Sequence, residues 1–145
     1  MLRFFSALLG GLMLVACLPA PSTDVPAPAA PDCRVTRVVD GDTVDLTCRT
    51  GGTVRARLLG FDTPEITDPG CAAERRLGLQ AKARLQALVA AAARLDTRFE
   101  GTDRYGRALV QLRLDGRDVA ATLIGEGLAV PYSGGRRISW CERLA

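Results

Sequence analysis

The feature that most constrains this chain is an apolar segment at residues 57–65 (RLLGFDTPE), which ends in two carboxylates and a proline. Apolar residues alternate with arginines up to Leu58, as expected of a strand with one buried face. Gly60 follows the break in this alternation, and a glycine inside a strand favours a bulge that redirects the chain. The sequence therefore predicts a strand over residues 53–61 with a bulge at Gly60.

The end of this strand carries the first candidate functional residues. Pro64 fixes its own backbone and disfavours a helical Thr63, so a stiff turn at a sheet edge is expected to present Asp62, Thr63 and Glu65. Two carboxylates and a carbonyl oxygen held in this way suit a hard cation. An ordinary strand end followed by a proline turn has the same sequence, so this segment alone leaves both interpretations open.

Composition limits both the fold and the chemistry. A chain of 145 residues, of which 48% are hydrophobic and 24% charged, predicts one ordinary globular domain. The formal net charge is only +3, and Lys82 is the only lysine among the 19 basic residues. The chain has no histidine, which excludes histidine bases and histidine-ligated zinc. Any hydrolytic chemistry must therefore depend on carboxylates, arginines and a metal ion.

The N-terminus has the features of an export signal. A charged start and a short apolar core predict a signal peptide over residues 1–16, too short to span a bilayer comfortably. The sequence LVAC that ends at Cys17 resembles a bacterial lipoprotein box. It predicts a lipid on Cys17 and a membrane-anchored lipoprotein in the cell envelope or periplasm. Signal-peptidase cleavage near Ala16 or Ala20, followed by secretion, is the alternative. Residues 17–32 are expected to form a proline-rich linker, and residues 33–145 the folded domain.

The first part of that domain is predicted to be a β-hairpin. Two runs rich in β-branched residues, 33–39 and 43–48, flank Asp40 and Gly41, a strong turn signal. If these two residues form the turn, the following positions pair: Val39 with Asp42, Arg37 with Val44, Val35 with Leu46, and Cys33 with Cys48. The core face then carries Cys33, Val35, Val39, Val44, Leu46 and Cys48. Asp42 lies at the open end of that face, where a carboxylate is costly unless a partner or a metal receives it.

The remaining elements complete a small barrel. A helix is predicted over residues 74–94, and strands over 96–100 and 107–114. The expected buried stripe of that helix comprises Leu77, Ala81, Leu85, Leu88, Val89 and Ala92. A short helix follows over residues 119–126, with Asp118 as its N-cap and Gly127 at its end. This order predicts an α+β, mainly β fold: a five-stranded OB-type barrel with helices packed at one end.

Three motifs together resemble a known family. They are residues 39–43 (VDGDT), 57–65 (RLLGFDTPE) and 102–107 (TDRYGR), in the order and at the spacing found in the staphylococcal nuclease (thermonuclease) family. The resemblance extends from about Cys33 to Leu128. It implies a calcium-dependent endonuclease that hydrolyses the phosphodiester bonds of DNA and RNA and leaves 3′-phosphate ends.

The resemblance also implies a role for each site residue. Asp42 and Asp62 would bind Ca²⁺ together with the main-chain carbonyl of Thr63, and Asp40 would lie nearby through water. These are the hard oxygen ligands that calcium prefers.

The resemblance also implies that three further residues perform the reaction. Arg57 and Arg107 would bind the phosphate and stabilise the charge that develops on it. Glu65 would act as the general base or would only orient the attacking water. Tyr105 and Tyr132 are the tyrosines available to contact substrate. The tail, residues 133–145, departs from the family pattern because it lacks a lysine-rich edge and a long final helix.

The five cysteines fit an exported protein. If Cys17 carries a lipid and the hairpin joins Cys33 to Cys48, then Cys71 and Cys141 remain as a second disulfide. Free buried thiols are the alternative.

A non-catalytic OB-fold module that binds single-stranded nucleic acid or a protein partner is the alternative function. Such a module is expected to offer several aromatic platforms for stacking, and only 5% of this chain is aromatic. Either way, we expect a monomer.

Overall fold

A computed structural model of the protein describes residues 32–145. The predicted signal peptide (1–16), the predicted lipid on Cys17 and nearly all of the predicted linker lie outside these residues. Within the described part of the chain, no helix is long and apolar enough to cross a membrane.

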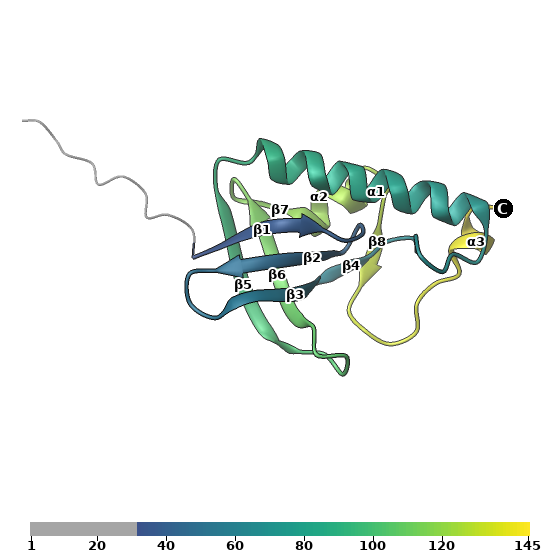
Figure 1. The fold of residues 1–145 in the computed structure, drawn as a ribbon. Coiled ribbons are helices and arrows are strands. Elements are labelled where there is room, and N and C mark those ends of the chain that lie inside the picture. Colours follow the sequence, from purple (N-terminus) through teal and green to yellow (C-terminus); the bar gives the residue numbers. More distant parts are fainter. Residues whose placement is uncertain (1–31) are drawn as a thin grey trace, which may run out of the picture.

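A curved sheet forms the body of the domain (Figure 1). Its strands are β1 (Cys33–Val38), β2 (Thr43–Cys48), β3 (Gly52–Leu58), β5 (Leu95–Thr102), β6 (Ala108–Leu114) and β7 (Arg117–Asp118). They pair in the order β1-β2-β3-β6-β5, β3 and β6 are parallel, and the short β7 pairs with β6. Because β1 also contacts β5, the sheet curls into a barrel. This confirms the predicted α+β fold of OB type.

The predicted hairpin is right at one end and wrong at the other. Cys33 lies opposite Cys48, as predicted, but a β-bulge between Val35 and Arg37 shifts the register by one residue. Arg37 therefore pairs with Asp45, and Val38 pairs with Val44. A bulge reverses which side chains face the core beyond it.

This register shift corrects the predicted core face. Val38 is buried, whereas Val39, predicted to lie on the core face, is only half-buried. The loop is also wider than the expected two-residue turn, because the backbone N–H groups of Val39 and Asp40 both donate to the carbonyl of Thr43.

Within residues 32–145, three helices accompany the barrel, and the longest, α1 (Ala72–Ala91), lies across it (Figure 1). It begins two residues before the predicted start at residue 74 and ends three residues before the predicted end at residue 94. Of the predicted stripe, Ala81 and Leu85 are fully buried, while Leu77, Leu88, Val89 and Ala92 are partly buried. Helix α2 (Val119–Gly125) has the predicted N-cap, because the carboxylate of Asp118 accepts the N–H of Ala120.

A second, two-stranded sheet explains the break at Gly60. Strand β4 (Gly60–Asp62) leaves the barrel sheet and pairs with β8 (Val130–Tyr132). Gly60 has a φ of 95°, a conformation that glycine adopts readily and other residues rarely do. The predicted interruption is thus confirmed, whereas β8 and the short helix α3 (Trp140–Arg143) were not predicted.

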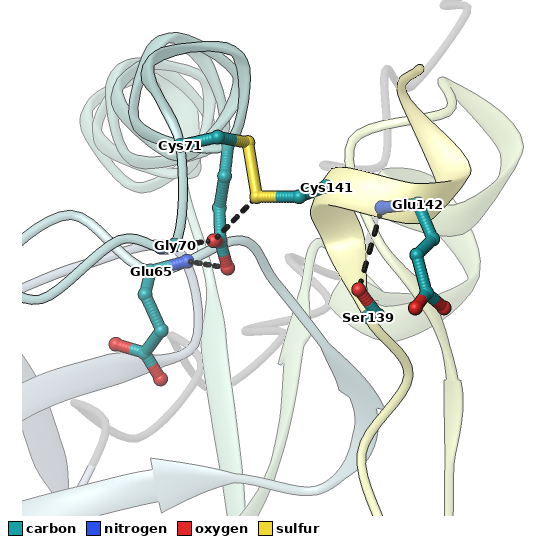
Figure 2. The surroundings of a disulfide bond; sticks show 7 residues. Glu65, Gly70, Cys71, Ser139, Cys141 and Glu142 are labelled. Carbon is teal, nitrogen blue, oxygen red and sulfur yellow. Dashed lines mark hydrogen bonds between the residues drawn. A yellow bond between two sulfur atoms is a disulfide. The ribbon is translucent and has the colours of Figure 1, made fainter.

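Both predicted disulfides are present. Cys33–Cys48 joins β1 to β2, and Cys71–Cys141 joins the residue before α1 to α3 (Figure 2). The second bond fastens the C-terminal tail beside the start of α1, next to the segment that connects β4 to α1.

The core fills the barrel and the space beneath α1. Its most deeply buried side chains are Val44, Leu46, Ala56, Leu58, Phe61, Leu85, Val110 and Leu123. Because this core supports β2, β3 and β4 from one side, the residues at the ends of these strands are held rigidly. Those ends carry the candidate site.

Candidate active site

Asp42 and Asp62 come from different strands and meet in the interior. Asp42 precedes β2 and is 4% exposed, and Asp62 ends β4 and is 1% exposed. The carboxylate of Asp42 accepts the Thr43 hydroxyl at 3.1 Å and the Thr63 N–H at 3.2 Å. The carboxylate of Asp40 accepts the backbone N–H of Asp42 at 3.1 Å and so fixes the Asp42 backbone. The Asp42 carboxylate is therefore held by both backbone and side-chain donors.

Arg57 bridges the two aspartates from β3. One terminal nitrogen lies 2.8 Å from the Asp42 carboxylate, and the other lies 3.3 Å from that of Asp62. The same nitrogens donate to the backbone carbonyls of Leu58 at 3.0 Å and Phe61 at 3.1 Å. Arg57 is only 5% exposed, so its charge is balanced by carboxylates and its N–H groups by carbonyls.

Two glycines let α1 pack directly on the site. A Cβ at Gly41 would lie 2.8 Å from the Cβ of Ala81 and 2.8 Å from the Thr63 hydroxyl oxygen. A Cβ at Gly78, inside α1, would lie 2.6 Å from the carbonyl oxygen of Pro64. Such distances are too short for packed atoms, so the missing side chains allow the helix to fix the turn that carries the catalytic candidates.

The buried carboxylate of Glu74 holds the turn from the opposite side. One oxygen accepts the backbone N–H of Glu65 at 3.3 Å, and the other accepts that of Gly70 at 2.7 Å (Figure 2). The second oxygen also lies 3.5 Å from the sulfur of Cys141, a contact only, because a disulfide sulfur has no hydrogen to donate. The Glu65 side chain points away from the disulfide (Figure 2), toward the pocket described below.

Arg137 is the main site residue that the sequence analysis missed. It lies in the loop of residues 133–139 between β8 and α3, and its Nε is 2.8 Å from the Asp62 carboxylate. The same guanidinium contacts Glu65 and lies 3.9 Å from Asp42. Trp140, also missed, donates its indole N–H to the second oxygen of Asp62 at 3.2 Å. The tail thus supplies two of the groups that contact the site carboxylates within residues 32–145.

Burial dominates the electrostatics of Asp42. It raises the pKa of this carboxyl from 3.8 to about 7, with the charge of Arg57 opposing the rise and the neighbouring Asp40 adding to it. For Arg137, partial burial lowers the pKa, but Asp62, Glu65 and Asp42 together raise it above its ordinary value. The cluster therefore favours additional positive charge.

Arg107 lies at the turn between β5 and β6, apart from this cluster. Asp103 accepts its Nε at 2.8 Å and its backbone N–H at 2.9 Å, which fixes both the turn and the side chain. The guanidinium lies over the ring of Tyr105, 5.6 Å from its centre. Tyr105 is 70% exposed, while the hydroxyl of Tyr132 donates to the carbonyl of Gly135 at 2.8 Å.

One pocket of about 980 Å³ joins the two halves of the site. Its lining includes the predicted residues Arg57, Glu65, Tyr105, Arg107 and Tyr132, together with Arg137. The structure therefore brings the predicted arginines, the glutamate and the tyrosines to one cavity. Asp42 and Asp62 lie behind Arg57 and Arg137, which both contact them.

The donor set fits a hard divalent cation. Asp42 and Asp62 offer carboxylate oxygens next to the backbone of Thr63, and oxygen ligands of this kind suit Ca²⁺. Arg137 already places a positive charge against these oxygens from the pocket side. Within residues 32–145, the one group of three potential side-chain ligands whose atoms lie together is a different set, Cys71, Glu74 and Cys141. Its two sulfurs are joined in a disulfide.

Comparison with known proteins identifies the family. A family model described as "Staphylococcal nuclease homologue" matches residues 55–139. The chain belongs to the staphylococcal nuclease family. The matched range includes Arg57, Asp62, Glu65, Arg107 and Arg137, whereas Asp42 lies before it.

Several curated proteins are similar to this chain at modest identity. The SPbeta prophage-derived endonuclease YokF of Bacillus subtilis is 38% identical over 101 residues, covering 68% of this chain and 33% of the relative. Endonuclease YncB of the same organism is 36% identical, covering 64% and 44% respectively. The thermonuclease of Staphylococcus intermedius is 34% identical, covering 66% and 56%. The chain thus spans between a third and just over half of these relatives.

The tail residues could have been found from the cysteines. The predicted bond between Cys71 and Cys141 already implies that the tail returns to the segment before α1, where Glu65 lies. Arg137 and Trp140 are four and one residues from Cys141, so the same bond brings them near Asp62. By contrast, no local pattern marks Glu74 as buried, because it lies in an otherwise exposed first turn.

Proposed function

We propose that this staphylococcal nuclease homologue is a calcium-dependent endonuclease that hydrolyses the phosphodiester bonds of DNA and RNA. The observation that carries the proposal is the pocket itself, in which Arg57, Glu65 and Arg107 face one cavity backed by the buried carboxylates of Asp42 and Asp62. The names of three relatives, two endonucleases and a thermonuclease, support the same reaction class.

The proposed substrate site lies on the Arg107 side of the pocket. Arg107 is fixed by Asp103 yet remains partly exposed, so it can donate to a phosphate oxygen. Tyr105 and Tyr132 line the same cavity and offer surfaces for a base or a sugar. We assign substrate contacts to these three residues.

The proposed metal ligands are Asp42, Asp62 and the carbonyl of Thr63. When bound, calcium would screen the carboxylates from the phosphate and stabilise negative charge on the phosphoryl oxygens. Without that screening, buried carboxylates beside the pocket would repel a polyanion.

Glu65 is proposed to orient a water molecule for in-line attack and to accept its proton. Its side chain is 43% exposed and extends into the pocket, while Glu74 fixes its backbone N–H. The water oxygen forms a bond to phosphorus as the bond to the 5′-oxygen breaks, and the departing 5′-oxygen takes a proton from solvent, which leaves a 3′-phosphate and a 5′-hydroxyl. Arg57 and Arg107 stabilise the charge that develops on the phosphoryl oxygens.

Arg107 gives the sharpest test, because it contacts neither of the proposed metal ligands Asp42 and Asp62. Arg107→Ala should reduce the turnover of DNA by roughly 10²–10³-fold, the usual cost of one preorganised donor, while calcium affinity measured by calorimetry stays constant. Arg113→Ala, an exposed arginine on β6 outside the pocket, is the matched control and should cleave like the wild type. Equal activity of the two variants would argue against a catalytic pocket and favour the non-catalytic OB-fold module.

The proposed location is outside the cytoplasm. We propose an exported monomer held to a membrane of the envelope by a lipid on Cys17, with the two disulfides as support, since such bonds form in oxidising compartments.

A further inference from the structure

Arg137 lies against all three carboxylates that the proposed reaction needs. Its Nε is 2.8 Å from Asp62, another nitrogen is 3.9 Å from Asp42, and a third contact reaches Glu65. The Arg137 side chain is 38% exposed, whereas that of Asp62 is 2% exposed. The arginine therefore covers the carboxylates from the pocket side, the side from which a ligand would approach.

The charges explain why the carboxylates accept a second arginine. Asp42, Asp62 and Glu65 carry three negative charges when ionised, and Arg57 balances one of them. The two aspartates are almost fully buried, so unbalanced charge there is costly. Arg137 supplies the next positive charge in a place where a divalent cation would supply two.

The two arginines differ in how easily they can be replaced. Arg57 is part of β3, is buried, and is also held by the carbonyls of Leu58 and Phe61. Arg137 lies in an irregular loop after Gly134 and Gly135, whose φ angles are 106° and 86°. Its ion pairs are with carboxylates that are themselves candidate ligands or neighbours of the metal. Arg137 is thus the replaceable cation of the cluster.

We propose that Arg137 occupies the position of the cation, competes with calcium for Asp42 and Asp62, and thereby sets the calcium affinity of the site. The inference rests on the proposed function, because it takes these two aspartates as metal ligands. A guanidinium and a divalent cation repel each other and seek the same oxygens, so each weakens the binding of the other. Linkage makes this effect reciprocal.

The loop keeps Arg137 close even when it is displaced. On one side of the loop, β8 pairs with β4, with Val130 opposite Asp62. On the other side, Trp140 donates to Asp62, and Cys141 is bonded to Cys71. A tethered competitor acts at a high effective concentration, so its influence on a weakly bound ion is large.

Calcium titration by calorimetry tests the proposal on the full chain with both disulfides formed. Arg137→Gln should bind calcium about tenfold more tightly than the wild type, a typical size for linked binding. Arg136→Gln is the matched control, because it removes the same charge from the same loop, and no ion pair within residues 32–145 involves Arg136. Equal affinities of Arg137→Gln and Arg136→Gln would overturn the proposal.

Chemical modification of the wild type gives a second test that needs no variant. Phenylglyoxal labelling followed by mass spectrometry should show Arg137 protected relative to Arg136 in chelator, and calcium should remove this protection. Unchanged labelling of Arg137 in saturating calcium would contradict displacement.

The outcomes separate this inference from the proposed function. A wild type that cleaves DNA with calcium, but whose Arg137→Gln variant has unchanged calcium affinity, refutes only the competition. A wild type that neither binds calcium nor cleaves DNA refutes both.

Discussion

Replacing Asp42 by asparagine should change how the stability of the metal-free protein depends on pH. Burial raises the pKa of Asp42 from 3.8 to about 7 in the folded protein. Between these two pKa values the folded state binds this proton more than the unfolded state does, so the contribution of Asp42 to stability is lost as the pH rises from about 4 through about 7. Asparagine has no proton to lose, so the variant lacks this contribution.

The size of the effect follows from the two pKa values. They differ by about three, and at about 1.36 kcal/mol per pKa unit this corresponds to about 4 kcal/mol in the free energy of unfolding. The stability of the wild type minus that of Asp42→Asn should therefore fall by up to about 4 kcal/mol between about pH 4 and about pH 8. Urea unfolding in chelator, followed by far-ultraviolet circular dichroism with the disulfides intact, measures this difference.

Asp45 provides a control of opposite sign. It is a neighbour of Asp42 in sequence, but the hydrogen bond from Arg55 holds its pKa below the ordinary value. The stabilisation from Asp45 is thus present above its unfolded pKa and lost as the pH falls. The stability of the wild type minus that of Asp45→Asn should rise with pH, whereas the Asp42 difference should fall. Parallel curves for the wild type and Asp42→Asn would refute the assigned role of burial.

Three further predictions concern packing, the tail and the membrane anchor. Gly78→Ala should destabilise the protein by about 1–3 kcal/mol in urea unfolding, because the new methyl meets the Pro64 carbonyl. Gly125→Ala, a helical position with open space, should be neutral or stabilising by up to about 1 kcal/mol, and the reverse order would contradict the packing argument. Replacing both Cys71 and Cys141 by serine should cost about 4 kcal/mol, and no loss of stability would show that the tail is not held by this bond. Cys17→Ser should abolish detergent-phase partitioning of the exported protein, and a wild type found in the aqueous phase would contradict lipidation.

Much of the barrel follows from local sequence signals. The strand break at Gly60, the Asp118 cap and the buried stripe through Ala81 and Leu85 depend on backbone geometry and on periodicity, which local sequence reveals. The hairpin register cannot be predicted from local sequence, because the bulge between Val35 and Arg37 has no glycine or proline to mark it. Asp42 still lies inside the barrel mouth, because its place depends on the β2 end of the hairpin.

The candidate site was predicted less completely than the fold. The family resemblance indicated Arg57, Glu65, Tyr105, Arg107 and Tyr132, which line the pocket, but the predicted roles did not include contacts between the site residues themselves. The structure shows that Arg57 is engaged by both aspartates and two carbonyls, which no spacing reveals. Arg137 and Trp140 reach the site only through tertiary contacts of an irregular tail, so periodicity could not find them.

The most direct test of the account is the cleavage of DNA by the purified wild type in calcium and in chelator. With calcium, the account predicts cleavage of internal phosphodiester bonds and fragments that end in a 3′-phosphate, which polymerase cannot extend until a phosphatase has treated them. With chelator, it predicts intact DNA. Intact DNA in saturating calcium, or equal cleavage in chelator, would contradict the proposal that Asp42 and Asp62 form the metal centre of a nuclease.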